Sequence, residues 1–123
     1  MKNPNFVLLY VKDPVASAAF YSRILGRPAI ETSENFAMVT LDGEFMLGLW
    51  AANDAQPAPT AAGGGSEIGF PAESKESVDE CHREWIRKGL PIAQPPTEMD
   101  FGYTFVAQDP DGHRLRVFCS RAA

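Results

Sequence analysis

The sequence predicts an α+β domain built from two similar modules, each with the element order β-α-β-β-β. An Asp-Gly pair running into a strand-like stretch occurs twice, as DGEFMLGLW at 42–50 and DGHRLRVFC at 111–119. An amphipathic helix that ends in glycine precedes each copy, and an apolar run opens each half, FVLLYV at 6–11 and EIGF at 67–70. Internal repetition of this kind indicates a fold made of equivalent units.

The first module follows from local signals. Residues 6–12 are apolar, β-branched and aromatic, as in a buried strand. Asp13 is a good N-cap and Pro14 suits the first helical position, so a helix should run to Leu25 and stop at Gly26. Its expected apolar stripe is Val15, Ala18, Ala19, Phe20 and Ile24, with Tyr21 and Arg23 on the solvent or dimer side. Strands are expected at 28–33, 35–41 and 44–51, the last two joined by a two-residue Asp42-Gly43 hairpin turn.

The second module repeats this order after a linker. We expect one domain over residues 1–123, with modules at 1–51 and 66–123 and a Pro/Ala/Gly-rich linker at 52–65. A strand at 66–72 precedes a helix that is capped by Ser74 or Ser77 and stops at Gly89. Its expected stripe is Val78, Cys81, Trp85 and Ile86. A short segment at 91–94 should break at Pro95-Pro96, before strands at 101–108 and 113–119.

Composition excludes several classes of function. The net charge of −5 argues against a nucleic-acid or anionic-membrane partner, because both require a basic face. No run approaches the roughly 18 apolar residues of a membrane span, and the N-terminus lacks a signal-peptide pattern. Two cysteines, Cys81 and Cys119, are too few for a disulfide framework. We therefore expect a cytoplasmic protein.

Strand alternation predicts which side chains lie on the sheet faces away from the helices. Leu115 and Val117 suit the helix side, which turns Arg116 outward, and the expected hairpin pairings extend this assignment to the other strands. The predicted outer set is mainly aromatic and apolar: Phe6, Tyr10, Phe36, Met38, Phe45, Leu47, Leu49, Tyr103, Phe105 and Phe118, with Glu67 and Arg116 among them. Such a surface with a few charges is typical of a small-molecule pocket. The alternative is a face that packs as plain core, on its counterpart or on a second subunit.

Two motifs carry a resemblance to a known family. VKDPVASAAFYSRILGR near the start and DPDGHRLRVF near the end resemble the vicinal oxygen chelate superfamily of glyoxalases, bleomycin-resistance proteins, fosfomycin-resistance enzymes and extradiol dioxygenases. The resemblance covers nearly the whole chain. It implies paired βαβββ modules whose mixed sheets curl into a cup, commonly in a homodimer.

The resemblance also implies where a metal would be held. The enzymes of that family bind a divalent ion at four His or Glu positions, which align here with Phe6, Leu47, Glu67 and Arg116, Leu47 being uncertain by one or two residues. Only Glu67 has a suitable donor, and Arg116 would repel a cation. We therefore expect no metal and no cofactor.

The resulting expectation is a metal-free protein that binds or sequesters a small hydrophobic or aromatic molecule, as antibiotic-resistance members of the family do. Glu67 and Arg116 would form a structural ion pair or read a polar group of the ligand. One alternative is a metal-dependent lyase or dioxygenase with non-standard ligands such as Glu44 or His113. Others are a metal-free isomerase with Glu67 as base, and a structural role in which the face is closed by dimerisation. Trp50, matched to Cys119 in the repeat, should lie on the helix side unless a bulge turns it outward.

Overall fold

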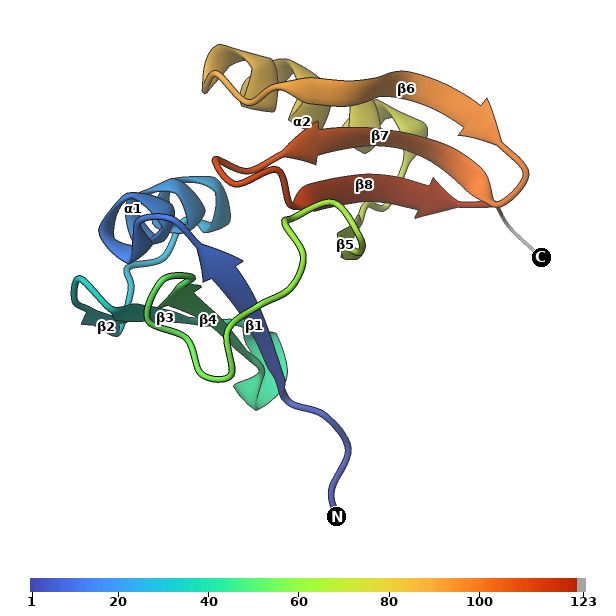
Figure 1. The fold of residues 1–123 in the computed structure, drawn as a ribbon. Helices are drawn as coiled ribbons and strands as arrows, with labels where there is room; N and C mark the ends of the chain where they lie inside the picture. Colours follow the sequence, from blue (N-terminus) through green and yellow to red (C-terminus); the bar gives the residue numbers. More distant parts are fainter. Residues whose placement is uncertain (122–123) are drawn as a thin grey trace. The chain divides into compact units, whose positions relative to one another are not determined.

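Each half of the chain folds into a four-stranded mixed sheet with a helix packed on one face (Figure 1). The computed structural model describes residues 1–121, which divide into two compact units between Ala62 and Gly63. The first unit contains β1 (Phe6–Val11), α1 (Pro14–Leu25), β2 (Glu31–Thr32), β3 (Phe36–Thr40), a 3-10 turn (Asp42–Glu44) and β4 (Met46–Ala51). The second contains β5 (Glu67–Pro71), α2 (Lys75–Arg87), β6 (Ile92–Met99), β7 (Gly102–Gln108) and β8 (Arg114–Ser120). The predicted α+β class and the doubled β-α-β-β-β order are confirmed.

The two sheets have the same topology. Their strand orders are β1-β4-β3-β2 and β5-β8-β7-β6. The first strand of each unit runs parallel to the last, and the remaining pairs are antiparallel. The two central strands are therefore β4 and β3 in the first sheet and β8 and β7 in the second.

Capping residues define both helices. The Asp13 carboxylate accepts hydrogen bonds from the backbone N–H of Val15 and Ala16 at 3.1 and 3.3 Å, and Gly26 ends α1 in the left-handed region at φ 71°. In α2 the cap is Ser74, whose hydroxyl accepts from the Ser77 N–H at 3.1 Å. Of the two predicted cap candidates, Ser74 holds this position.

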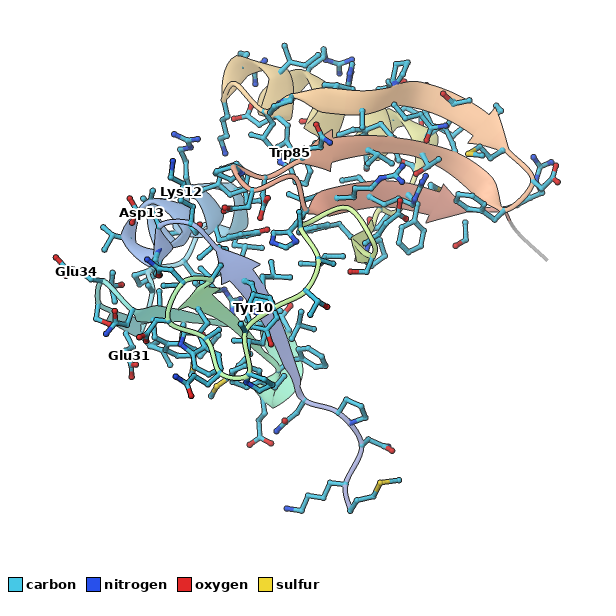
Figure 2. The ribbon with its side chains drawn as sticks, in the orientation of Figure 1. Tyr10, Lys12, Asp13, Glu31, Glu34 and Trp85 are labelled. Atoms are coloured by element: carbon cyan, nitrogen blue, oxygen red, sulfur yellow. The ribbon has the colours of Figure 1, made fainter. Side chains whose placement is uncertain are left out.

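The helix stripes are partly different from those predicted. Tyr21, expected on the solvent side, is fully buried and packs edge-on against Phe20 at 5.0 Å. Val15 and Ile86, expected in the core, are 47% and 50% exposed. Trp85 is core as predicted, between α2 and the sheet against Phe105 (Figure 2). The errors fall at the edges of each stripe, where a rotation of one helical position changes a side chain from buried to exposed.

Both central hairpins differ from the predicted register by one residue. The Leu41 N–H donates to the Phe45 carbonyl, so the first turn spans residues 42–44 instead of two residues. Asp109 and His113 close the second turn in the same way around residues 110–112. Gly43 and Gly112 take positive φ in these turns, at 66° and 83°. A one-residue change in register moves every side chain of one strand to the opposite face relative to its partner.

The Pro95-Pro96 pair does not break its strand. It lies within β6, an edge strand whose pairing with β7 shifts register between Ile92 and Gln94 and again between Gln94 and Thr97. Proline lacks a backbone N–H and is tolerated at such edges and bulges. The segment expected at 28–33 contracts to β2, residues 31–32. Among the described residues no helix combines the length and the apolar character needed to cross a bilayer.

Candidate functional site

The face of each sheet opposite its helix is called here its open face. In the first unit, Leu9 and Val11 of β1 and Ala37 and Val39 of β3 are buried on the helix side. The alternating residues of these strands and their β4 partners form the open face: Phe6, Leu8, Tyr10, Phe36, Met38, Thr40, Met46, Gly48 and Trp50. Phe6, Tyr10, Phe36 and Met38 are therefore where the sequence placed them.

Leu47 and Leu49 are on the opposite side from the one predicted. They pair with Val39 and Ala37 and are 2% and 0% exposed, so they belong to the core beneath α1. The cause is the longer turn, which shifts β4 by one residue against β3. Phe45 lies before β4, at the residue that closes the turn.

An aromatic pair lies on the first open face, and the sequence assigned only one of its two members, Tyr10, to this face. Trp50, expected on the helix side, pairs with Phe36 across β3 and with Tyr10 across β1. The rings of Tyr10 and Trp50 are 6.4 Å apart at 39°, and Tyr10, labelled on β1 in Figure 2, is 36% exposed. Reading the Asp42 turn with one more residue would have found Trp50, because the shifted register turns it outward.

The Phe6 ring covers Gly48 on the same face. A Cβ added at Gly48 would lie 2.8 Å from two carbons of this ring and 2.9 Å from Leu8. Glycine thus permits the Phe6 ring to lie close against the backbone of β4, and Phe6 is 40% exposed. The result is an apolar floor next to the Tyr10–Trp50 pair.

In the second unit, Tyr103 and Phe105 are also on the helix side, against prediction. The Tyr103 hydroxyl donates to Asp79 of α2 at 2.7 Å, and this bond raises the pKa of the phenol. Phe105 is fully buried against the rings of Trp85 and His82, at 5.5 and 5.1 Å. The second turn shifted their register in the same way as the first.

Glu67 and Arg116 lie on the second open face, as predicted, and form a bidentate ion pair. Nε and Nη2 of Arg116 donate to Oε1 and Oε2 of Glu67 at 2.7 and 3.0 Å. Nη1 donates to Gln94 Oε1 and to Thr104 Oγ1, both at 3.2 Å. The Thr104 hydroxyl in turn donates to the Val117 carbonyl at 2.8 Å. This polar network joins all four strands of the sheet.

The network determines the chemistry of Glu67. The Arg116 guanidinium holds the pKa of the Glu67 carboxyl below its ordinary value, against a smaller opposite effect of burial. A second cation, Arg114, lies 3.4 Å from Glu67 Oε2 through its Nε. A carboxylate held ionised between two guanidinium groups is a weak base, which disfavours Glu67 as a proton acceptor.

Phe118 completes this face, as predicted. Its ring lies over Gly69 of β5, where an added Cβ would meet the nearest ring carbon at 3.1 Å. Phe101, in the turn before β7, is 46% exposed, and the Arg116 guanidinium lies 5.7 Å from its ring centre. The second face is therefore a charged network bordered by two aromatic rings.

Comparing the strand registers shows which residues of the two units correspond. Phe45 and His113 close the equivalent turns, so Met46 corresponds to Arg114 and Gly48 to Arg116. Phe6 pairs with Met46 and Glu67 pairs with Arg114, so Phe6 corresponds to Glu67. The alignment of the two Asp-Gly pairs had assigned Leu47 to the place of Arg116. It was wrong by one residue because Asp-Gly begins the first turn but ends the second.

The corrected positions do not fit a divalent metal. Phe6 and Gly48 carry no donor atom, Arg116 is cationic, and both oxygens of Glu67 accept hydrogen bonds from Arg116. Within residues 1–121, no three His, Cys, Asp or Glu side chains gather as metal ligands would, so Glu44 and His113 do not belong to such a cluster.

Comparisons with known proteins agree with this fold. Residues 3–117 match the sequence profile of the Glyoxalase/Bleomycin resistance protein/Dioxygenase superfamily. The phenazine antibiotic resistance protein EhpR of Enterobacter agglomerans is 30% identical over 118 residues, covering 93% of this chain and 89% of EhpR.

Two solved structures are similar over nearly the full chain. A protein from Agrobacterium tumefaciens is 41% identical with a TM-score of 0.90, covering 99% of this chain and 100% of its own. A glyoxalase/bleomycin resistance protein/dioxygenase family enzyme from Burkholderia phytofirmans is 25% identical with a TM-score of 0.79, covering 95% and 98%. The chain therefore belongs to the glyoxalase/bleomycin resistance protein/dioxygenase superfamily.

Proposed function

We propose that this protein binds and sequesters a small planar aromatic molecule of the phenazine class, without a metal and without chemical conversion. The observation that carries the proposal is the aromatic surface of the first open face, where Phe6, Tyr10, Phe36 and Trp50 lie on adjacent strands. The resemblance to EhpR, a phenazine antibiotic resistance protein, supports the ligand class.

The energetics of stacking support a flat ligand. Phe6 and Tyr10 are 40% and 36% exposed although they are large and aromatic. A fused three-ring heterocycle that covers them would bury apolar area worth about 25 cal/mol per Å², with a further gain from ring stacking. Gly48 keeps the floor beneath the Phe6 ring free of a side chain that would project toward such a ligand.

The charged network supports binding over catalysis. In the metal-assisted members of the family, the sequence resemblance implies His or Glu at the places of Phe6, Leu47, Glu67 and Arg116, and the observed register replaces Leu47 with Gly48. In this protein the first unit has the Phe6 ring over Gly48, and the second unit has the bidentate ion pair of Arg116 with Glu67. Both arrangements supply surface and rigidity, and neither supplies an available acid, base or metal ligand.

Thermal unfolding with and without phenazine tests the proposal. A ligand that binds only the folded state raises the midpoint in proportion to the logarithm of its excess over Kd. We expect phenazine to raise the midpoint of the parent protein, and Trp50→Ala to remove most of this rise. Ile86→Ala is the matched control, because Ile86 is an exposed apolar residue on α2, and it should leave the rise unchanged.

Two results would overturn the proposal. The first is no stabilisation of the parent protein at saturating phenazine. The second is equal stabilisation of the parent, Trp50→Ala and Tyr10→Ala proteins, which would place binding away from the first open face.

A further inference from the structure

The open face of the second unit carries an uncompensated positive charge in a chain that is acidic overall. Along β5 to β8 its charged side chains are Glu67, Arg114 and Arg116, two guanidinium groups against one carboxylate. The net charge of the whole chain is −5. A local cationic excess on a surface that also bears aromatic rings is complementary to an aromatic anion.

Arg116 is not the residue that supplies this excess. Its side chain is 19% exposed, and its guanidinium donates four hydrogen bonds to Glu67, Gln94 and Thr104. A ligand anion would have to displace one of these partners to gain an equivalent bond. Its charge is matched by Glu67 in the bidentate pair.

Arg114 has the free donors. Its ion pair with Glu67 runs through Nε, 3.4 Å from Oε2, and its side chain is 39% exposed. Neither Nη1 nor Nη2 makes a hydrogen bond to any described residue. These two nitrogens form a planar pair of donors that matches the two oxygens of a carboxylate.

A flat aromatic platform lies one row of side chains away. The Phe118 ring lies over Gly69, and Gly69 is the β5 residue that pairs with Arg116. Although the Phe118 Cα is two residues further along β8, the ring therefore lies beside Arg116 along the strand direction. Arg114 is two residues along the same strand, a spacing of about 7 Å. A fused-ring system on this platform would place a carboxylate on its edge within reach of the Arg114 guanidinium.

We propose that Arg114 reads the carboxylate of a planar aromatic acid whose rings stack on Phe118 over Gly69. The inference rests on the proposed function for its ligand class, and it assigns a second stacking surface, on the open face of the second unit, in addition to the aromatic surface of the first unit. It assigns the recognition of a charged ligand group to Arg114, in place of the Glu67–Arg116 pair to which the sequence assigned the reading of a polar group.

The test compares two ligands of nearly the same shape, one anionic and one neutral. Phenazine-1-carboxylate and the neutral phenazine-1-carboxamide are titrated calorimetrically at low salt into the parent protein, Arg114→Gln and Arg87→Gln. We expect the parent to bind the carboxylate about tenfold more tightly than the carboxamide, a typical effect of a charge-assisted bidentate contact. Arg114→Gln should bring this ratio near one without changing the carboxamide Kd. Arg87→Gln, which removes the same charge from α2, should keep the ratio.

The outcomes separate the two proposals. If the carboxamide binds but the parent shows no preference for the carboxylate, the Arg114 inference fails and the binding function stands. If neither ligand binds, the binding function fails, and the inference with it. If the preference persists in Arg114→Gln and disappears in Arg116→Gln, the reading residue is Arg116 and the inference is wrong. Unfolding curves of each variant confirm that it is folded.

Discussion

Arg116 binds the Glu67 carboxylate through two parallel hydrogen bonds of 2.7 and 3.0 Å, across the parallel pair β5–β8. The same guanidinium holds Gln94 and Thr104 of the other two strands. A single side chain therefore connects the whole width of the second sheet on its open face. The pair is partly exposed, at 19% for Arg116 and 31% for Glu67.

This network predicts a measurable coupling between the two residues. Arg116→Gln removes the partner of Glu67 and two further bonds, and should lower the free energy of unfolding by about 1–2 kcal/mol. A double-mutant cycle with Glu67→Gln, measured by urea denaturation, should show that the losses are not additive. Additive losses would mean that the pair contributes no interaction energy.

The same pair predicts a dependence of stability on acid pH. Because Arg116 lowers the pKa of Glu67 below its ordinary value of 4.5, the unfolded chain takes up this proton first as the pH falls. The contribution of the pair is therefore complete at neutral pH and is lost as the pH falls from about 4.5 through the lowered pKa. Thermal unfolding midpoints should fall less steeply in this range for Glu67→Gln than for the parent protein. Parallel curves for the two would show that Glu67 has the same affinity for protons in both states.

The corrected faces predict losses of stability of different size for two phenylalanines of the second sheet. Phe105 is fully buried against Trp85, so Phe105→Ala should cost about 3–5 kcal/mol of stability. Phe118 is half-buried on the open face, so Phe118→Ala should cost about 1 kcal/mol and weaken the binding of phenazine-1-carboxylate. Chemical denaturation and calorimetry measure the two quantities. The reverse ranking of stability losses would contradict the register described for β7 and β8.

The donor set predicts the outcome of metal analysis. With Phe6 and Gly48 lacking donor atoms and Glu67 paired to Arg116, we expect less than stoichiometric zinc, nickel, manganese or iron in protein purified without chelators. Elemental analysis by mass spectrometry measures this directly. One bound metal per chain that is lost in a Glu67→Gln protein would contradict this prediction. It would support the metal-assisted chemistry of the family.

Local chemistry predicted most of the fold. The cap at Asp13, the stops at Gly26 and Gly89 and the doubled strand pattern gave the correct order of elements, because each depends on residues adjacent in sequence. The edges of the helix stripes were wrong, as Tyr21 shows, because burial there depends on how the helix rotates against its sheet.

The candidate site was predicted less well, and for one physical reason. An Asp-Gly pair is compatible with turns of two or of three residues, and only the hydrogen bond from Leu41 to Phe45 distinguishes them. Assuming two-residue turns assigned Leu47, Leu49, Tyr103 and Phe105 to the wrong face of their sheets. The same assumption assigned Trp50 to the helix side instead of the open face. Residues whose assignment did not depend on these turns, such as Phe6 and Glu67, were placed correctly.

The two tryptophans provide the most direct test of the central claim, since Trp50 lies on the open face of the first unit and Trp85 lies in the core of the second. Each gives one indole N–H signal in a nitrogen-15 correlation spectrum, assignable with Trp50→Phe and Trp85→Phe. On titration with phenazine we expect the Trp50 signal to shift with saturation and the Trp85 signal to stay in place. A shift of Trp85 alone, or no shift of either signal at saturating phenazine, would contradict binding on the aromatic open face.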